Sequence, residues 1–331
     1  MTFTEITAHE FDKFAFDAKG HNFLQSSAFA SVRAKRGAAP KLFAVKDGAR
    51  IVLAGLCGAY GTSLDCLYGP VGDATPESIR AWTAGLSACA KPAARASGHK
   101  PKIYLSISPF FPVAESKPWQ ALGWRALKRG LGGRLRYIAA RPLPASYDQL
   151  LNSLDRKMRY EIRRAAKNGL KLRDLSYDEL PILEQLLQAS ADRKDFQIND
   201  LAYLQMFHRA YEGNPDYQVR FVVVEHDQEP IAGGVFVFSK LECVHFLGGN
   251  SAKSLELGGM YYLLNAMMQA SIGQGIPRFN FFGVNGLGGS DSGLVFKRKW
   301  GAEVTEMFGV WVFPVDKLKF MAWQIKQLVI K

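Results

Sequence analysis

The sequence of 331 residues contains little that would suit a metalloprotein, a disulfide-rich protein or a membrane-spanning protein. Its four cysteines form no C-x-x-C pair and have small or apolar neighbours, which favours free thiols in a reducing compartment. No group of histidines and cysteines has the spacing of metal ligands, so we expect no metal. No apolar run approaches the roughly 18 residues that a spanning helix needs. The N-terminus mixes acidic and basic residues and lacks a signal peptide's apolar centre, which predicts a cytoplasmic protein.

Acidic residues are too few to balance the basic ones. The chain has 42 lysines and arginines against 30 aspartates and glutamates, which gives a net charge of +12. Such an excess favours a polyanionic partner, which can be a nucleic acid, a phosphorylated small molecule or an anionic membrane face. The length exceeds that of a usual single domain, and we therefore expect two domains.

The pattern of apolar and polar residues predicts one order of elements twice. The first half contains two helices within residues 1–36, strands at 42–47, 51–60 and 64–68, a helix at 77–91, a strand at 103–108, a short helix at 119–122 and a strand at 135–140. The second half contains a helix at 147–167, a strand at 170–175, helices at 178–193 and 200–211, strands at 218–225, 231–238 and 243–248, a helix at 258–272, strands at 279–284 and 304–313, and a closing helix at 317–330. This order is typical of a mixed α/β acyltransferase fold of the GNAT type, present twice.

The most informative stretch runs from Arg278 to Gly301 and reads RFNFFGVNGLGGSDSGLVFKRKWG. It begins as a buried strand, breaks into a glycine-rich loop and ends in a basic segment that contains Phe296 and Lys297. Such an arrangement can hold an ammonium group at a reacting centre, and the alternative is a solvated basic helix end. Two further stretches stand out, the basic helix LDRKMRYEIRRAAKNG at 154–169 and the segment NFLQSS at 22–27.

In order and rough spacing, these stretches resemble the signature blocks of the Fem/Mur family of non-ribosomal peptidyltransferases. The strand at 279–284 is similar to the family pattern Y-[ND]-[FL]-x-G-[IV], and GLVFK at 293–297 is similar to G-[LV]-x-x-F-K. The basic helix resembles K-x-R-x-x-I-x-x-A-x-x-x-G, and NFLQSS resembles the N-F-x-Q-S entry into the family's first helix. The resemblance extends over nearly the whole chain.

This resemblance implies two tandem GNAT-like domains, the first made of residues 1–145 and 314–331 and the second of residues 146–313. Residues 189–200 leave no room for the long helical hairpin of some members, so the compact form is expected. The implied activity is aminoacyl transfer in peptidoglycan biosynthesis, from an aminoacyl-tRNA to the side-chain amine of the third residue of a stem peptide. The acceptor would be UDP-MurNAc-pentapeptide or a lipid-linked precursor, and the protein would act as a monomer. The ester is already activated, so no cofactor is expected.

The resemblance also assigns candidate site residues. Lys297, which follows Phe296 in the GLVFK segment, takes the catalytic position, where an ammonium group would support the developing oxyanion. Lys299 is the competing lysine. The candidates for contact with the precursor are Arg33, with Ser31 as an alternative at that position, Lys35, Arg193, Tyr203 and Tyr262.

The basic helix at 154–169 is the candidate surface for tRNA. Arg156, Arg159, Arg163 and Lys167 recur every three or four residues and so share one face, while Ile162 and Ala166 are expected to point inward. A basic stripe of this kind suits phosphates, although an ordinary amphipathic surface helix has the same pattern. The positive charge would also allow contact with an anionic membrane face.

Two other functions remain as alternatives. The same fold could carry an N-acyltransferase that uses acyl-CoA, but the segment ELGGM at 256–260 lacks the Q/R-x-x-G-x-G/A spacing that holds pyrophosphate. A non-catalytic RNA-binding protein would explain the charge, but it would leave the Phe296–Lys297 pair without a role.

Overall fold

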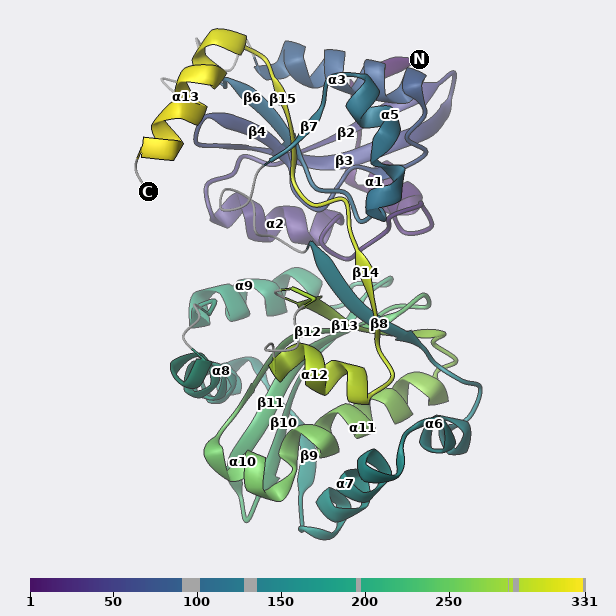
Figure 1. Cartoon of the computed structure of the whole chain (residues 1–331), viewed down its shortest axis with the longest axis vertical. Helices are drawn as coiled ribbons and strands as arrows, with labels where there is room; N and C mark the ends of the chain where they lie inside the picture. Colours follow the sequence, from purple (N-terminus) through teal and green to yellow (C-terminus); the bar gives the residue numbers. More distant parts are fainter. Residues whose placement is uncertain (91–101, 128–135, 195–197, 285, 288–291, 330–331) are drawn as a thin grey trace. The chain divides into compact units, whose positions relative to one another are not determined.

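The structure is a computed structural model of the whole chain, and it describes residues 1–90, 102–127, 136–194, 198–284, 286–287 and 292–329. The chain forms two compact units, one made of Met1–Arg136 with Glu306–Lys331 and the other of Tyr137–Thr305 (Figure 1). Each unit is built on one mixed β-sheet. Among the helices that can be described, none is both long and apolar enough to cross a bilayer.

The sheet of the first unit has the strand order β1-β2-β3-β4-β6-β15-β7, with β5 paired to β3. The pair β4–β6 is parallel, whereas β1–β2, β2–β3 and β15–β6 are antiparallel. The expected hairpin joins β2 to β3 through Gly48, whose φ of 59° lies in the left-handed region that glycine tolerates. The strands are β1 Thr2–Glu5, β2 Lys41–Asp47, β3 Arg50–Tyr60, β4 Ser63–Cys66, β5 Val71–Gly72, β6 Tyr104–Ile107, β7 Arg125–Ala126 and β15 Trp311–Pro314.

Helices cover this sheet and close its core. Helix α3 buries Ile79, Trp82 and Leu86 in one cluster with Trp119 and Trp124. Full burial of one large apolar side chain contributes about 2–3 kcal/mol, so this aromatic cluster is a main source of the unit's stability. The helices are α1 Ala8–Ala15, α2 Ser27–Lys35, α3 Pro76–Ala90, η1 Val113–Ser116, α5 Lys117–Ala121 and α13 Lys317–Val329.

The sheet of the second unit has the order β14-β8-β13-β12-β11-β10-β9. The pair β12–β13 is parallel, and the pairs β9–β10, β10–β11, β11–β12 and β13–β8 are antiparallel. Among the strand pairs whose direction is described, each sheet thus has one parallel pair and otherwise antiparallel ones. The strands are β8 Tyr137–Pro142, β9 Lys171–Asp174, β10 Gln218–His226, β11 Glu229–Phe238, β12 Cys243–Asn250, β13 Arg278–Val284 and β14 Glu303–Glu306.

The core of the second unit lies between this sheet and helices α7 and α11. Met158 and Ile162 of α7 join Leu263 and Met267 of α11 in one buried cluster. Helix α7 ends as expected at Asn168 and Gly169, where the φ of Gly169 is 65°. The helices are α6 Tyr147–Ser153, α7 Arg156–Lys167, η2 Tyr177–Glu179, α8 Leu180–Lys194, α9 Leu201–Tyr211, α10 Ala252–Leu257, α11 Gly259–Gly273 and α12 Ser292–Lys299.

The structure differs from the expected elements where the chain passes between the units. The strand expected at 304–313 is divided into β14 and β15, which belong to different sheets, and the interruption contains Gly309 with a φ of 72°. Strand β8, which the expected boundary at residue 145 assigned to the first domain, pairs with β13 in the second sheet. Residues 195–200 alone separate α8 from α9, which is too short a connection for a long helical arm.

Candidate active site

Strand β13 contains a β-bulge that its asparagine holds in place. The pairing with β8 shifts in register between Asn280 and Gly283, and Phe282 has a φ of 62°, in the left-handed region. The Asn280 side-chain oxygen accepts a hydrogen bond of 2.8 Å from the Phe282 N–H. The amide nitrogen of Asn280 donates to the buried carboxylate of Glu242 at 3.1 Å. The asparagine of the sequence motif therefore shapes the strand that precedes the candidate catalytic lysine.

Helix α12 places the side chain of Lys297 against the end of this strand. The Lys297 Nζ atom donates a hydrogen bond of 2.7 Å to the carbonyl oxygen of Gly283. Phe296 packs edge-on against Tyr261 of α11 with ring centroids 5.2 Å apart, and Trp300, which directly follows the helix, is fully buried. These contacts fix the helix, and the half-buried ammonium group of Lys297 is consequently held at one place.

A glycine turn and an arginine side chain hold the main chain at the C-terminal end of α12. Gly301 has a φ of 76°, and Arg141 donates from Nη1 to the Trp300 carbonyl oxygen at 2.7 Å. The competing lysine of the motif, Lys299, is exposed and lies two positions beyond Lys297, so its side chain leaves the helix in another direction. Of the two lysines, Lys297 is therefore the one that contacts β13.

A histidine of β12 lies within the electrostatic influence of Lys297. Burial, together with the positive charge of Lys297, lowers the pKa of His245 from 6.5 to about 3, although a hydrogen bond with the Leu247 backbone opposes this shift. The imidazole stacks on Phe236 with centroids 4.8 Å apart, and its Nε2 atom is shielded from solvent and has no hydrogen-bond partner among the described residues. A side chain with so low a pKa is a poor general base at neutral pH, so we interpret His245 as a packed residue and not as a catalytic base.

The described pairing between β12 and β13 is short and precedes the residues that contact Lys297. Parallel pairing of β12 with β13 is recorded for Cys243 with Phe279 and for Val244 with Asn280. Beyond these pairs, the ring of Phe246 on β12 meets that of Phe282 on β13 edge-on, with centroids 5.4 Å apart. Lys297 therefore contacts β13 beyond the residues that pair with β12.

The depressed pKa of His245 makes stability depend on pH. The unfolded chain takes up a proton at this group near pH 6.5, whereas the folded chain does so only near pH 3. Stability from this group is therefore present above pH 6.5 and is lost as the pH falls towards 3. His245→Phe, which keeps the stack on Phe236, should lower the pH slope of the unfolding free energy by about one proton in this window. Urea titrations between about pH 4 and pH 6.5 measure this slope.

The exposed His9 provides the control for this substitution. His9→Phe should leave the slope as it is in the unmodified protein. Equal slopes for the protein with and without His245 would show that this group titrates normally and that its burial has no electrostatic consequence.

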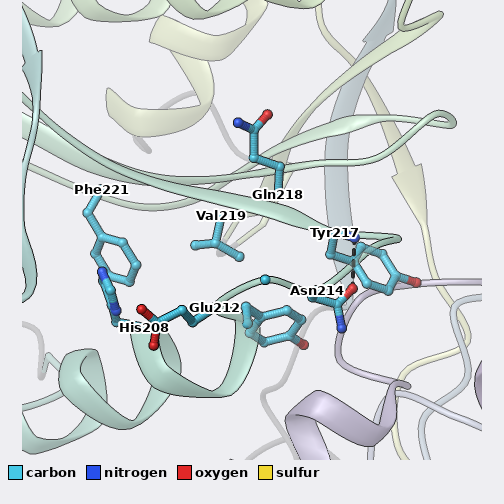
Figure 2. Close-up of a pocket in the computed structure, with 9 residues that line it drawn as sticks. His208, Glu212, Asn214, Tyr217, Gln218, Val219 and Phe221 are labelled. Atoms are coloured by element: carbon cyan, nitrogen blue, oxygen red, sulfur yellow. Dashed lines mark hydrogen bonds between the residues drawn. The ribbon is translucent and has the colours of Figure 1, made fainter.

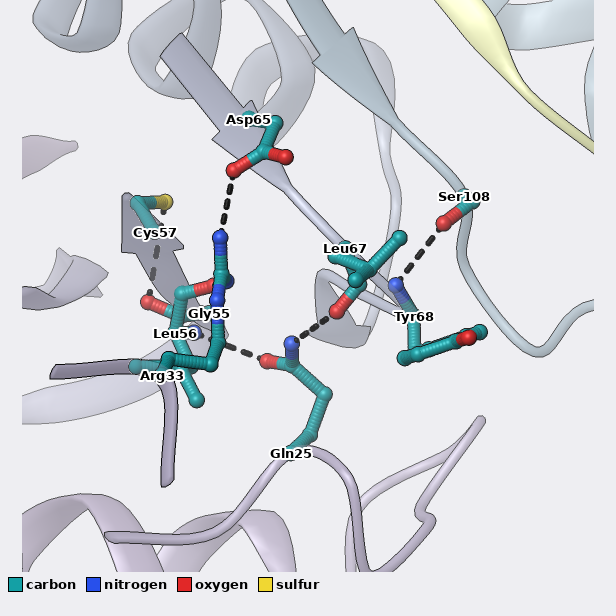
Figure 3. A network of polar contacts seen from close by, with 9 residues as sticks. All are labelled: Gln25, Arg33, Gly55, Leu56, Cys57, Asp65, Leu67, Tyr68 and Ser108. Atoms are coloured by element: carbon teal, nitrogen blue, oxygen red, sulfur yellow. Dashed lines mark hydrogen bonds and ion pairs between the residues drawn. The ribbon is translucent and has the colours of Figure 1, made fainter. Parts of the chain in front are cut away.

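In the first unit, the segment NFLQSS organises the loop before β5 (Figure 3). The Gln25 amide bridges two main chains, because Oε1 accepts from the Leu56 N–H at 2.8 Å and Nε2 donates to the Leu67 carbonyl oxygen at 2.7 Å. Asn22 donates to the Tyr68 carbonyl oxygen at 3.0 Å, and Ser26 caps α2 through the Phe29 N–H. In this structure, the polar residues of the motif hold the backbone together.

The two basic candidates after this motif have different surroundings. The side chain of Arg33 is buried and forms an ion pair of 2.5 Å with Asp65, and it also donates to the Leu56 carbonyl oxygen at 3.2 Å (Figure 3). Lys35 and the alternative residue Ser31 are exposed. Arg33 therefore stabilises β3 and β4 from within, and Lys35 is the cation that faces solvent.

The precursor-side candidates of the second unit also differ in exposure. Arg193 lies at the surface and binds the end of β12, where its Nη2 atom donates to both the main-chain and the side-chain oxygen of Asn250. Tyr203 is buried and stacks on Phe207 with centroids 6.0 Å apart. Tyr262 is half-buried, and it is the preceding Tyr261 that contacts Phe296. Tyr261 is thus a neighbour of the candidate catalytic segment that sequence reasoning missed.

Helix α7 turns a basic face towards solvent. Met158, Ile162 and Ala165 point inward, which corrects the expectation that Ala166 would do so, because Ala166 is exposed. Arg156, Arg163 and Lys167 are exposed on the opposite side of the helix.

Arg159 does not belong to this exposed face. It is half-buried, and its Nη1 atom donates to the Leu154 carbonyl oxygen at 2.5 Å. Tyr160 takes its place on the outer face and is 57% exposed. We call Arg156, Tyr160, Arg163 and Lys167 the α7 face. An exposed aromatic ring among cations is a combination that binds single-stranded nucleic acid.

A cavity of about 280 Å³ lies between the end of α9 and the start of β10 (Figure 2). His208, Tyr217 and Phe221 contribute rings to its wall. Asn214 also lines the cavity, and its side-chain oxygen accepts hydrogen bonds from the N–H groups of Asp216 and Tyr217. None of the residues predicted from the sequence lines it. In the part of the chain that the structure describes, no three His, Cys, Asp or Glu side chains are grouped as metal ligands.

Comparison with known proteins agrees with this architecture. The crystal structure of FemX matches with a TM-score of 0.80 at 17% identity and covers 97% of this chain and 99% of that one. A tandem GNAT protein from the clavulanic acid biosynthesis pathway matches with a TM-score of 0.53 at 10% identity, over 95% and 98% of the two chains. These likenesses confirm the predicted fold of two GNAT-like domains.

Sequence relatives point in the same direction. Aminoacyltransferase FemA of Staphylococcus epidermidis is 24% identical over 237 residues, which cover 52% of this chain and 57% of that protein. Aminoacyltransferase FemA of Staphylococcus aureus is 23% identical over 241 residues, covering 53% and 57%. The chain thus spans little more than half the length of the curated relatives it matches. The model of the FemAB family matches residues 121–225 and 218–327, which together make up more than half of the chain. The chain therefore belongs to the FemAB family.

Proposed function

We propose that the protein is an aminoacyltransferase that transfers an amino acid from an aminoacyl-tRNA to a peptidoglycan precursor. The acceptor group is the side-chain amine of the third residue of the stem peptide. The observation that carries this proposal is the position of Lys297, whose ammonium group is fixed by the Gly283 carbonyl oxygen beyond the paired part of β12 and β13. Membership of the FemAB family and relatives named aminoacyltransferase support the same reaction class.

The proposed reaction needs one new bond and releases one alcohol. The neutral amine attacks the ester carbonyl, a C–N bond forms, and the C–O bond to the ribose breaks while the ribose oxygen takes up the proton that the amine loses. The Lys297 ammonium group donates to the Gly283 carbonyl oxygen, and this bond holds it in position. We assign to Lys297 the stabilisation of the oxyanion, a role for which a single donor contributes about 3–4 kcal/mol.

The partners follow from the same proposal. The donor is an aminoacyl-tRNA, and the acceptor is UDP-MurNAc-pentapeptide or its lipid-linked form. Lys35 and Arg193 are exposed cations suited to the phosphates of the precursor, with Tyr262 as a further contact. The burial of Arg33 and Tyr203 favours a supporting role for both. We further propose that the protein acts as a cytoplasmic monomer in peripheral contact with the inner face of the cell membrane.

A transfer assay tests this function. The purified protein is incubated with tRNAs charged with one radiolabelled amino acid at a time and with UDP-MurNAc-pentapeptide or lipid-linked precursor. Label in either precursor supports the proposal and identifies the donor. If neither precursor is labelled and acetyl-CoA is consumed on an amine instead, the protein is an acyl-CoA-dependent N-acyltransferase and the proposal is wrong.

A further inference from the structure

We propose that helix α13 of the first unit is a membrane-docking surface that binds anionic lipid. This inference names the element responsible for the peripheral membrane contact in the proposed function. Three large apolar side chains of α13 point into solvent, with exposed fractions of 80% for Leu318, 58% for Met321 and 61% for Ile325. Their spacing of three and four residues places all three on one side of the helix. We call these three residues the α13 stripe.

The opposite side of α13 is anchored, which fixes the direction of the stripe. Phe320 is buried, and its ring meets Tyr104 of β6 with centroids 5.4 Å apart. Trp323 contacts the same tyrosine at 4.9 Å and stacks on Phe320 at 5.7 Å. The helix is the yellow element beside β6 in Figure 1. Because aromatic residues already hold its inner side, the helix cannot rotate to bury the stripe without breaking these contacts.

Single exposed apolar residues are ordinary, but a stripe is not. In the described part of the chain, the other strongly exposed apolar side chains include Val113, Leu255 and Val295, and each lies on a different element. Among the described residues, α13 is the one element on which three such side chains follow one another along a single face. Exposure of this kind costs free energy in water and indicates a surface that is covered in use.

The charges around the stripe favour an anionic lipid surface as that cover. Residues 317–331 contain four lysines and neither aspartate nor glutamate. Lys317 and Lys319 are exposed and flank the stripe on its two sides. Lys319 forms an ion pair of 3.0 Å with Asp316, just before the helix. An interfacial helix has an apolar face that enters the boundary of the acyl chains and lysines whose long stems reach the headgroups beside it.

Vesicle flotation tests the proposal on the full chain. Vesicles of phosphatidylglycerol and phosphatidylethanolamine in equal parts are compared with vesicles of phosphatidylcholine alone. The unmodified protein should float with the anionic vesicles and not with the neutral ones. The triple variant Leu318→Ser, Met321→Ser, Ile325→Ser should bind at least about tenfold more weakly, because the apolar contribution is removed. Lys317→Gln should weaken binding at low salt and have little effect at high salt.

The matched control is Leu255→Ser, which removes a side chain of equal exposure, 63%, from α10 and should bind vesicles as the unmodified protein does. Equal flotation of the triple variant and the unmodified protein would overturn the proposal. A change from dimer to monomer in the triple variant, without vesicle binding by the unmodified protein, would also overturn it and make the stripe an interface between copies. Transfer to soluble UDP-MurNAc-pentapeptide should be equal in the unmodified protein and in all variants. Absence of transfer in the unmodified protein and every variant, to the soluble and to the lipid-linked precursor alike, would count against the proposed function alone.

Discussion

Replacing Lys297 by methionine is expected to slow aminoacyl transfer by about 100-fold or more, the effect of removing one oxyanion donor. Methionine keeps an unbranched apolar stem beside β13 but cannot donate to the Gly283 carbonyl oxygen or to a substrate oxygen. Phe296 and Trp300 hold α12 independently of the ammonium group, so the fold and the affinity for UDP-MurNAc-pentapeptide should be preserved. Single-turnover transfer rates and precursor dissociation constants measure the two quantities separately.

Lys299→Met is the matched control, since Lys299 lies on the same helix and is exposed. This variant should transfer at nearly the rate of the unmodified protein. If both methionine variants were equally active, the assignment of Lys297 would be wrong. If Lys297→Met lost precursor binding in proportion to its rate, Lys297 would be a binding residue instead.

Reversing two charges of the α7 face should weaken tRNA binding by about 100-fold at low salt and reduce the slope of log K against log salt by about one to two. Arg156→Glu with Arg163→Glu is the appropriate variant, because both side chains are exposed, whereas Arg159 is bound to the Leu154 carbonyl oxygen. Tyr160→Ala should weaken binding by about 1–3 kcal/mol without a change of slope, since stacking on a base releases no counterion. Filter binding over a range of salt concentrations gives both quantities.

Arg80→Glu with Lys117→Glu changes the net charge equally at exposed positions of the first unit. This control should bind tRNA much as the unmodified protein does. If it weakened binding as strongly as the α7 variant, binding would depend on the overall charge of +12 and not on the α7 face.

The sequence was sufficient to predict the family and the double fold, because periodicity and the order of the motifs extend over many residues. It placed Lys297 in a motif, but the contact with Gly283 depends on a bulge that a pattern does not reveal. Arg33 was assigned to contact with the precursor, since its partner Asp65 lies on another element and nothing local in the sequence indicates the pair. Tyr160 was passed over because its exposure follows from which side of α7 packs inward.

The boundary between the units was the least predictable part of the fold. Residues 304–313 are apolar enough for one strand, and only the tertiary structure divides them between two sheets at Gly309. His245 shows the same limit for electrostatics, because its depressed pKa arises from burial within the fold and from the charge of Lys297, which lies far along the chain. Contacts between residues that are distant in the sequence determine both the division of residues 304–313 and the pKa of His245.

The most direct test of the central claim identifies the bond that the protein forms. UDP-MurNAc-pentapeptide with a free side-chain amine on its third residue is compared with the same precursor acetylated at that amine, each with the charged tRNA that supports transfer. Mass spectrometry should find one added aminoacyl group on the third side chain of the free precursor and none on the acetylated one. Transfer to the acetylated precursor, or to any other position of the free one, would contradict the proposed reaction.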